Sequence, residues 1–220
     1  ICGDAKAVAE ALCEKLVSEK LSCDSTTEER AQKIADEKAV WELELDEWIH
    51  ETDSYSMDMI ANKEEGWLHP RQVLRELEKA MPEDVMVSTD IGNINSVANS
   101  YLRFEKPRSF CAAMSWGNCG YAFPTIVGAK AAAQHRPAVS YAGDGAWAMS
   151  MVETMTCVRH DIPVTAVVFH NRDWGAEKKN QVDFYDRRFV AAELTDQNFV
   201  DIAKSMGAKG IRVDKLEDVG

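Results

Sequence analysis

The sequence predicts an α/β fold, a doubly wound parallel sheet with helices on both faces, preceded by a helical remnant and connector. Two observations predict it. From Trp67 onward, short and nearly continuous apolar segments alternate with amphipathic helical stripes, which is typical of parallel strands buried on both faces. The chain also has 220 residues, of which 45% are apolar, and this is enough to build one complete core.

Two helical segments precede this sheet domain. Residues 4–21 carry apolar side chains at spacings of three and four, and we assign residues 1–24 to the C-terminal remnant of a preceding domain. Residues 25–66 begin with a cap-like Thr and continue as a charged helix, so we assign them to an acidic helical connector. Acidic residues outnumber basic ones by 18 to 7 in residues 1–65, so nearly all of the net charge of −12 lies there.

Residues 67–220 are assigned to the parallel-sheet domain. Its expected strands are 85–89, 109–114, 138–142, 164–169 and 211–213. Its expected helices are 70–81, 93–102, 124–134, 147–159 and 198–206, and residues 170–188 are expected to form a long loop that faces the substrate. The strand at 211–213 is followed only by the start of a helix, which indicates that the domain is cut at its C-terminus.

Composition disfavours several kinds of partner. Neither half of the chain has an excess of basic residues, so nothing could displace the counterions of a nucleic acid. No apolar run reaches the roughly 18 residues that a membrane span needs. The six cysteines show no C-x-x-C spacing, which indicates reduced thiols and a cytoplasmic location rather than a disulfide framework or a zinc site.

Three strand-to-helix turns carry polar residues and glycines: 90–93, 143–145 and 170–175. Ligands of open parallel sheets bind outside the carboxyl ends of the strands, and glycines let the backbone approach a phosphate closely. The first two turns by themselves also fit a simpler interpretation, in which Asp90 or Asp144 only caps the following helix. The spacing of the turns favours the first interpretation.

Asp144 and Asn171 end consecutive expected strands, with 25 residues between Gly145 and Asn171. In a βαβ unit, two such side chains emerge side by side at the carboxyl edge of the sheet. A carboxylate, an amide oxygen and a backbone carbonyl suit Mg²⁺, which usually keeps phosphate oxygens among its other ligands. The pair could therefore hold a metal diphosphate.

This arrangement resembles the thiamine-diphosphate signature of the pyruvate decarboxylase and acetolactate synthase superfamily, in which GDG is followed by NN. His170 stands in place of the first Asn and Asn171 matches the second. The resemblance implies thiamine diphosphate and Mg²⁺ as cofactors. It also implies that Asp144, Asn171 and the carbonyl of Asp173 bind the metal, and that Gly143, Gly145 and Ala146 lie against the diphosphate.

Two more segments resemble this superfamily. The segment 117–124, Gly-Asn-Cys-Gly-Tyr-Ala-Phe-Pro, is similar to its G-x-M-G-x-G-x-P segment. This implies that the Gly117 carbonyl and the Cys119 amide hold the aminopyrimidine ring, with Cys119 at the position that props the bent cofactor. The turn at 90–93 resembles the D-x-G turn of the family, which implies that Gly92 and Asn93 lie near the diphosphate.

Within the superfamily, residues 67–77, 114–124 and 168–181 resemble the sulfoacetaldehyde acetyltransferase family. The resemblance implies conversion of sulfoacetaldehyde and phosphate to acetyl phosphate and sulfite, a place in sulfonate catabolism and taurine degradation, and a homodimer or homotetramer. It covers the end of the middle domain and the diphosphate domain, so the glutamate that the first domain supplies to activate the cofactor is expected to be absent. Another thiamine-diphosphate lyase, like acetolactate synthase or oxalyl-CoA decarboxylase, and an inactive cofactor-binding fragment remain alternatives.

Several side chains near these turns are candidates for acting on the substrates. Glu177 and His170 lie beside the expected metal site and could move protons, although His170 could equally be structural. Two anionic substrates would need basic side chains nearby to bind them. Each basic residue in this region could instead be a solvated surface charge. The candidates are Arg172, Lys178, Lys179, Arg187 and Arg188, with Arg103, Lys106 and Arg108 before the second strand.

Overall fold

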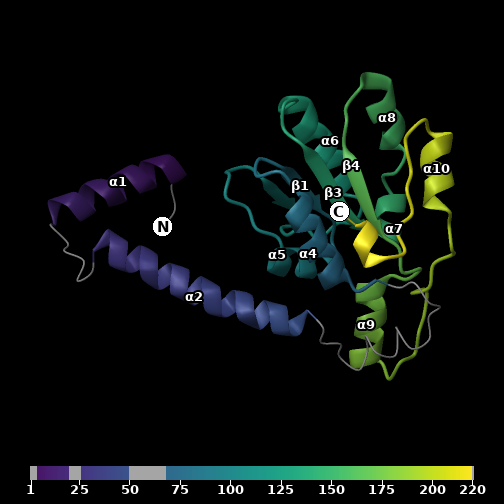
Figure 1. Ribbon diagram of the computed structural model, residues 1–220, viewed down its shortest axis with the longest axis horizontal. Helices are drawn as coiled ribbons and strands as arrows, with labels where there is room; N and C mark the ends of the chain where they lie inside the picture. Colours follow the sequence, from purple (N-terminus) through teal and green to yellow (C-terminus); the bar gives the residue numbers. More distant parts are fainter. Residues whose placement is uncertain (1–3, 20–25, 50–67, 220) are drawn as a thin grey trace. The chain divides into compact units, whose positions relative to one another are not determined.

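The computed structural model describes residues 4–19, 26–49 and 68–219, and it divides the chain into two compact units, residues 1–47 and 48–220 (Figure 1). Each unit is described by itself. The expected boundary at residues 66 and 67 lies outside the described residues, so the assignment of domains stays a prediction. None of the described helices is both long and apolar enough to cross a membrane.

The first unit is helical, as predicted. Helix α1 spans Ala5–Ser18, and the carboxylate of Asp4 caps it by accepting hydrogen bonds from the amides of Lys6 and Ala7. Helix α2 spans Thr27–Trp48, and its last residue belongs to the second unit. It begins with a capping box, because the Thr26 hydroxyl accepts from the Glu29 amide and the Glu29 carboxylate accepts from the Thr26 amide.

The second unit is built on a parallel sheet of four strands in the order β2-β1-β3-β4. These strands confirm four of the five expected ones. Their bounds are Met86–Thr89 for β1, Phe110–Ala112 for β2, Ala138–Gly143 for β3 and Thr165–Phe169 for β4.

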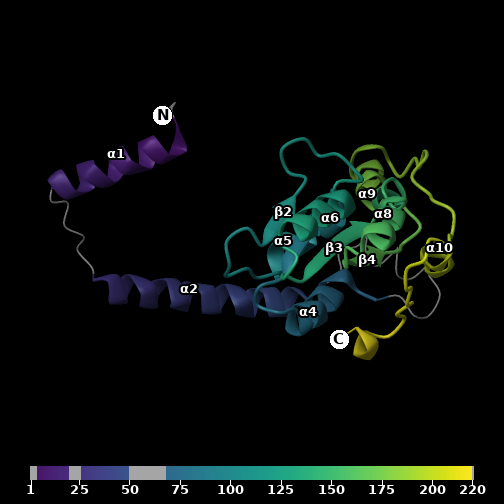
Figure 2. The ribbon, with the colours of Figure 1, turned by 90° about the horizontal axis from the view of Figure 1, so that it is seen from above.

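Helices cover both faces of this sheet. Helices α4 (Pro70–Ala80) and α5 (Asn93–Tyr101) pack together on one face. Helix α6 (Ala122–Ala132) packs on β1 and β3 from the other face, together with α8 (Glu153–His160). Figure 2 shows α4 and α8 on opposite sides of the sheet. The connection from β1 runs toward one edge and those from β2 and β3 run toward the other, so right-handed crossovers place their helices on opposite faces.

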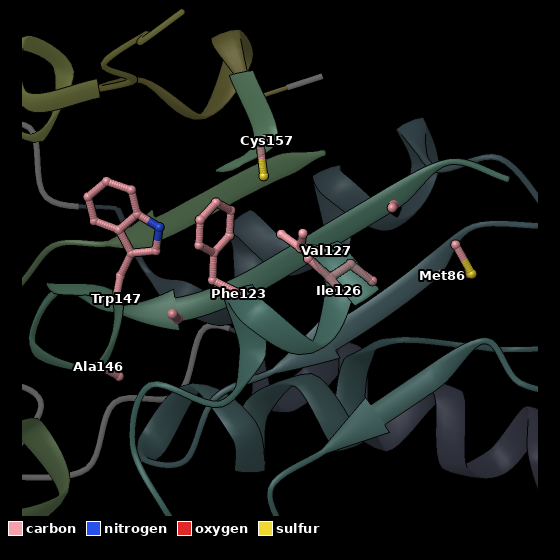
Figure 3. Close-up of a cluster of buried hydrophobic side chains, with 9 residues drawn as sticks. Met86, Phe123, Ile126, Val127, Ala146, Trp147 and Cys157 are labelled. Atoms are coloured by element: carbon pink, nitrogen blue, oxygen red, sulfur yellow. The ribbon is translucent and has the colours of Figure 1, made fainter. Parts of the chain in front are cut away.

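The core between α6 and the sheet is apolar and closely packed (Figure 3). Phe123, Ile126 and Trp147 are at most 4% exposed there, and the rings of Phe123 and Trp147 meet edge to face. On the opposite face Leu74 and Tyr141 are fully buried, and the Tyr141 hydroxyl donates to Met81 Sδ. Burial on both faces explains why β1 and β3 are nearly continuous apolar segments in the sequence.

Three expectations about elements are wrong. The helix expected at 147–159 is divided into α7 (Asp144–Ala148) and α8, joined by residues 149–152. Residues 211–213 form no strand, because Ile211 is 85% exposed and three residues of alternating pattern do not by themselves specify pairing with β4. The expected loop at 170–188 contains helix α9 (Gly175–Phe184), which carries no apolar stripe that could reveal it.

The remaining elements follow β4. Helix α10 (Phe199–Ser205) confirms the helix expected at 198–206, and a short 3₁₀ helix spans Leu216–Asp218. Four cysteines lie among the described residues, and all four are free thiols, as predicted: Cys13, Cys111, Cys119 and Cys157.

Candidate functional site

The topology itself marks a binding place at the carboxyl edge of the sheet. Strands β1 and β3 are neighbours, but the chain leaves β1 toward β2 and leaves β3 toward β4. A crevice opens at such a switch point, outside the carboxyl ends of the strands, and it is where open α/β sheets bind ligands. Asp90 follows β1 and Asp144 follows β3, so both predicted turns lie beside this switch point.

Asp90 is fully buried and organises the glycine-rich turn. Its Oδ1 accepts from the Gly120 amide at 3.0 Å and its Oδ2 from the Ala122 amide at 2.9 Å. Burial raises the pKa of Asp90, and the backbone hydrogen bonds oppose that shift. The interpretation of Asp90 as a cap of the next helix is wrong, because the N-cap of α5 is Gly92 and no side chain caps that helix. Instead, Asp90 holds the beginning of α6.

The turn that Asp90 holds depends on its glycines. Gly117 and Gly120 have φ of +70° and +78°, which side-chain-bearing residues rarely adopt, and a Cβ on Gly120 would lie 3.1 Å from Met149 Cβ. Cys119, which lies between these glycines in the sequence, packs against the apolar core between α6 and the sheet. Its pKa is raised by burial first, and then by the negative charges of Asp90 and Glu177. The expected ring-holding segment therefore lies close to both acids.

Asp144 is 2% exposed and joins the turns that follow β3 and β4. Its Oδ1 accepts from the Gly145 amide at 2.9 Å and its Oδ2 from the Arg172 amide at 2.6 Å. The simpler interpretation as an N-cap does not hold, because Gly143 is the N-cap of α7. Burial raises the pKa of Asp144, and the hydrogen bonds from Arg172 and Gly145 oppose that rise.

The structure brings Asn171 and Asn93 together at the beginning of α9. A Cβ on Gly175 would lie 3.1 Å from Asn171 Nδ2 and 3.3 Å from Asn93 Nδ2. The side-chain oxygen of Asn171 accepts from the Asp173 amide at 3.2 Å. The turns after β1 and β4 therefore both approach Gly175.

The residues after Asn171 are fixed by a returning segment. The Trp174 amide donates to the Ala192 carbonyl at 2.7 Å, and the Leu194 amide donates to the Arg172 carbonyl at 2.8 Å. Asp173 is 6% exposed and forms a 2.8 Å ion pair with Lys178. The positive charge of Lys178 is thus already matched, which makes it a poorer candidate for holding a substrate anion.

The other candidate side chains take different positions. His170 Nε2 lies 3.4 Å from Asp196 Oδ1 and 3.8 Å from Asp144 Oδ2, and its ring meets Phe199 of α10. Glu177 is exposed in the first turn of α9. Among the cations, Arg172 pairs with Asp196 at 3.4 Å and Lys179 with Asp183 at 2.9 Å, while Arg187 and Arg188 are exposed.

The donor atoms at this edge suit a hard cation. Among the described residues there is no group of three or more His, Cys, Asp or Glu side chains that could hold a metal. A metal at this edge would therefore have to combine the Asp144 carboxylate with neutral oxygens, such as the Asn171 amide oxygen and the Asp173 carbonyl. Carboxylate, amide and carbonyl oxygens are the ligands that Mg²⁺ takes beside phosphate. A cation there would also compensate the buried charge of Asp144.

One contact at this edge was not foreseen from the sequence. A Cβ on Gly145 would lie 2.7 Å from two carbons of the Trp174 ring, so the indole rests directly on this glycine. The available signal was the glycine itself, at a helical position where glycine is unfavourable without a packing reason.

Comparison with known proteins adds a family to this geometry. Residues 90–220 match the family described as "Thiamine pyrophosphate enzyme, C-terminal TPP binding domain". All of the chain is similar to the sulfoacetaldehyde acetyltransferases of Castellaniella defragrans (74% identical, 37% of that protein) and Alcaligenes xylosoxydans xylosoxydans (69% identical, 38%). The mitochondrial acetolactate synthase of Schizosaccharomyces pombe is 31% identical over 68% of the chain and 23% of its own length. The chain thus spans little more than a third of the two acetyltransferases and about a quarter of the synthase.

Proposed function

Because the chain belongs to the thiamine pyrophosphate enzyme family, we propose that it forms the cofactor-binding part of an enzyme that converts sulfoacetaldehyde and phosphate to acetyl phosphate and sulfite. The observation that carries this proposal is the 74% and 69% identity to sulfoacetaldehyde acetyltransferases over the entire chain. The acetolactate synthase alternative is weaker, since its similarity is 31% and covers 68% of the chain.

Asp144, Asn171 and the Asp173 carbonyl would hold Mg²⁺, and Gly143, Gly145, Ala146, Gly92 and Asn93 would line the diphosphate. The support is the proximity of the turns after β1, β3 and β4 at the carboxyl edge of the sheet. The Gly117 carbonyl and the Cys119 amide would hold the aminopyrimidine ring, in a turn that Asp90 fixes. When bound, thiamine diphosphate supplies the nucleophilic carbon that attacks an aldehyde.

Glu177 and His170 would act on the reacting groups from two sides. Glu177 is exposed at the beginning of α9 and close enough to the ring-holding turn to raise the pKa of Cys119, so it could exchange a proton with a ligand there. The His170 ring packs on Phe199, and its Nε2 lies 3.4 Å from Asp196 Oδ1 and 3.8 Å from the buried Asp144. Arg187 and Arg188, both exposed after α9, would meet the sulfonate or phosphate.

We also infer a homodimer or homotetramer with its active site between chains, working in the cytoplasm in sulfonate catabolism such as taurine degradation. Large apolar side chains exposed next to the ring-holding turn support an interface, since Trp116 is 90% and Met114 65% exposed. The free thiols among the described cysteines support a reducing compartment.

The experiment incubates the protein with Mg²⁺, thiamine diphosphate and either sulfoacetaldehyde plus phosphate or pyruvate, and it measures acetyl phosphate, sulfite and acetolactate. Acetyl phosphate and sulfite in equal amounts support the proposal. Turnover of pyruvate alone would assign the chain to a different lyase. A protein that binds thiamine diphosphate in calorimetry but forms no product from either substrate would be a cofactor-binding fragment.

A further inference from the structure

We propose that Trp174 is a positioning residue for the metal-binding turn: its indole ring, seated on Gly145, sets the spacing between the turns that follow β3 and β4. This inference rests on the proposed cofactor site, because Asp144 lies on the first turn, and Asn171 and Asp173 on the second. The ring would thereby control whether donors from two separate strands can reach one cation.

The Trp174 ring occupies the space that a Cβ on Gly145 would need, so a side chain there would force the ring to shift. A Cβ there would lie 2.7 Å from Cη2, 2.7 Å from Cζ3 and 2.9 Å from Cζ2 of the ring. The φ of Gly145 lies outside the left-handed region, so its backbone does not require glycine. The absence of a side chain is needed for the ring and, in the proposed complex, for the diphosphate.

The backbone that carries the Trp174 ring is held by hydrogen bonds on both sides. Its amide donates to the Ala192 carbonyl at 2.7 Å, and its carbonyl accepts from the Lys178 amide at 2.8 Å in the first turn of α9. The neighbouring Arg172 is held in the same way, because its carbonyl accepts from the Leu194 amide at 2.8 Å. The segment 192–194 thus runs beside residues 172–174 and fixes the backbone from which the ring projects.

The turns after β3 and β4 are joined by several contacts, and two of them matter for the proposed donors. One is the hydrogen bond from the Arg172 amide to Asp144 Oδ2, at 2.6 Å. The other is the packing of Trp174 on Gly145. The hydrogen bond is made at Asp144, whereas the ring rests on the next residue, Gly145, and so restrains rotation of one turn about that hydrogen bond. Removing the ring should loosen the donor set without removing any donor.

A competing explanation assigns Gly145 to the cofactor alone, because a glycine lets the backbone approach a diphosphate closely. The two explanations differ in one consequence. If a methyl group on Gly145 acts by displacing the ring, then removing the ring should restore cofactor binding to Gly145→Ala. If the methyl group obstructs only the diphosphate, then removing the ring should leave the cofactor binding of Gly145→Ala as weak as before.

The experiment measures the affinity of the protein for thiamine diphosphate in Mg²⁺ by calorimetry, together with the melting temperature, for Gly145→Ala, Trp174→Ala and the double variant. We expect Gly145→Ala to weaken binding about tenfold or more, and the double variant to bind at least about threefold more tightly than Gly145→Ala alone. Trp174→Ala should by itself weaken binding severalfold. Gly128→Ala, in α6 where a Cβ meets no atom within 4 Å, is the matched control and should bind normally.

Two outcomes overturn the proposal: a double variant that binds no better than Gly145→Ala, or a Trp174→Ala protein with a lowered melting temperature and unchanged affinity. If Gly145→Ala does not fold, the folding and binding of the double variant decide in the same way. Calorimetry contains no substrate, so a protein that binds cofactor but leaves sulfoacetaldehyde unchanged contradicts only the proposed function. A protein that binds no thiamine diphosphate contradicts both.

Discussion

Charged side chains bind backbone groups at both edges of the sheet, but the sign of the charge differs between the edges. At the amino edge, the Arg136 guanidinium donates to the backbone carbonyls of Asp84 and Arg108 and to the Ser109 hydroxyl. Lys130, 8% exposed, donates to two more carbonyls at the end of α6. At the carboxyl edge, buried carboxylates accept from backbone amides instead, through Asp90 and Asp144.

This difference follows from the direction of parallel strands. Each helix is followed by a loop that enters the next strand at the amino edge, and there cations bind loop carbonyls such as those of Asp84 and Arg108. Helices begin where strands end, so the carboxyl edge gathers unpaired amides, and anions satisfy them. A buried carboxylate can also bind a metal ion. The same rule that stabilises both edges therefore makes only the carboxyl edge suitable for a metal diphosphate.

The largest expected effect comes from removing the carboxylate of Asp144. We expect Asp144→Ala to weaken Mg²⁺-dependent binding of thiamine diphosphate by about 100-fold or more, because a metal would lose its only charged protein ligand. Calorimetry with and without Mg²⁺ measures this loss. Asp84→Ala, an exposed aspartate at the amino edge, is the matched control and should leave the affinity unchanged. Undiminished binding by Asp144→Ala would exclude this site.

The second effect separates stability from binding at the amino edge. Arg136 bridges the backbone segments before β1 and β2, so we expect Arg136→Ala to lower the free energy of unfolding by about 1.5–3 kcal/mol, the range for hydrogen bonds from a charged donor. Urea unfolding measures the loss, and cofactor affinity measured below the transition should stay within about twofold of the parent. A loss of affinity comparable to that of Asp144→Ala would show that the edges are not independent.

Much of this contrast could be predicted from the sequence, because the strands and the turns that follow them are marked by local sequence patterns. Four strands were predicted because their apolar segments are continuous, and the approach of Asp144 to the turn after β4 followed from parallel topology alone. The partners of Asp90 and Arg136 could not be predicted, because they lie about 30 residues away and up to 52 residues away, respectively. Helix α9 was missed because it carries no apolar stripe and none of its residues is buried. Sequence identifies a charged residue, whereas only the fold identifies the group it pairs with.

A smaller effect compares cations at the two edges. We expect Arg188→Ala, after α9 at the carboxyl edge, to raise the KM for phosphate about tenfold, equivalent to about 1.4 kcal/mol. Arg108→Ala, at the amino edge before β2, should leave the KM unchanged. Acetyl phosphate formation at varied phosphate measures both. Equal effects of the two substitutions would mean that general surface charge, rather than a site at the carboxyl edge, attracts the anion.

The smallest effect concerns the protonation of Asp90. Burial raises the pKa of this carboxyl in the folded protein above its ordinary value of 3.8, so between these two values the folded state binds more protons than the unfolded one. The stabilising contribution is therefore fully present below pH 3.8 and is lost as the pH rises through the folded-state pKa.

Asp90→Asn cannot titrate, so the free energy of unfolding of the parent minus that of the variant should fall as the pH rises through this window. Urea unfolding at a series of pH values measures that difference. Arg136→Ala, which leaves Asp90 in place, should keep the pH dependence of the parent. A difference that rises with pH instead would mean that the amides of Gly120 and Ala122 outweigh burial and make Asp90 a stabilising anion.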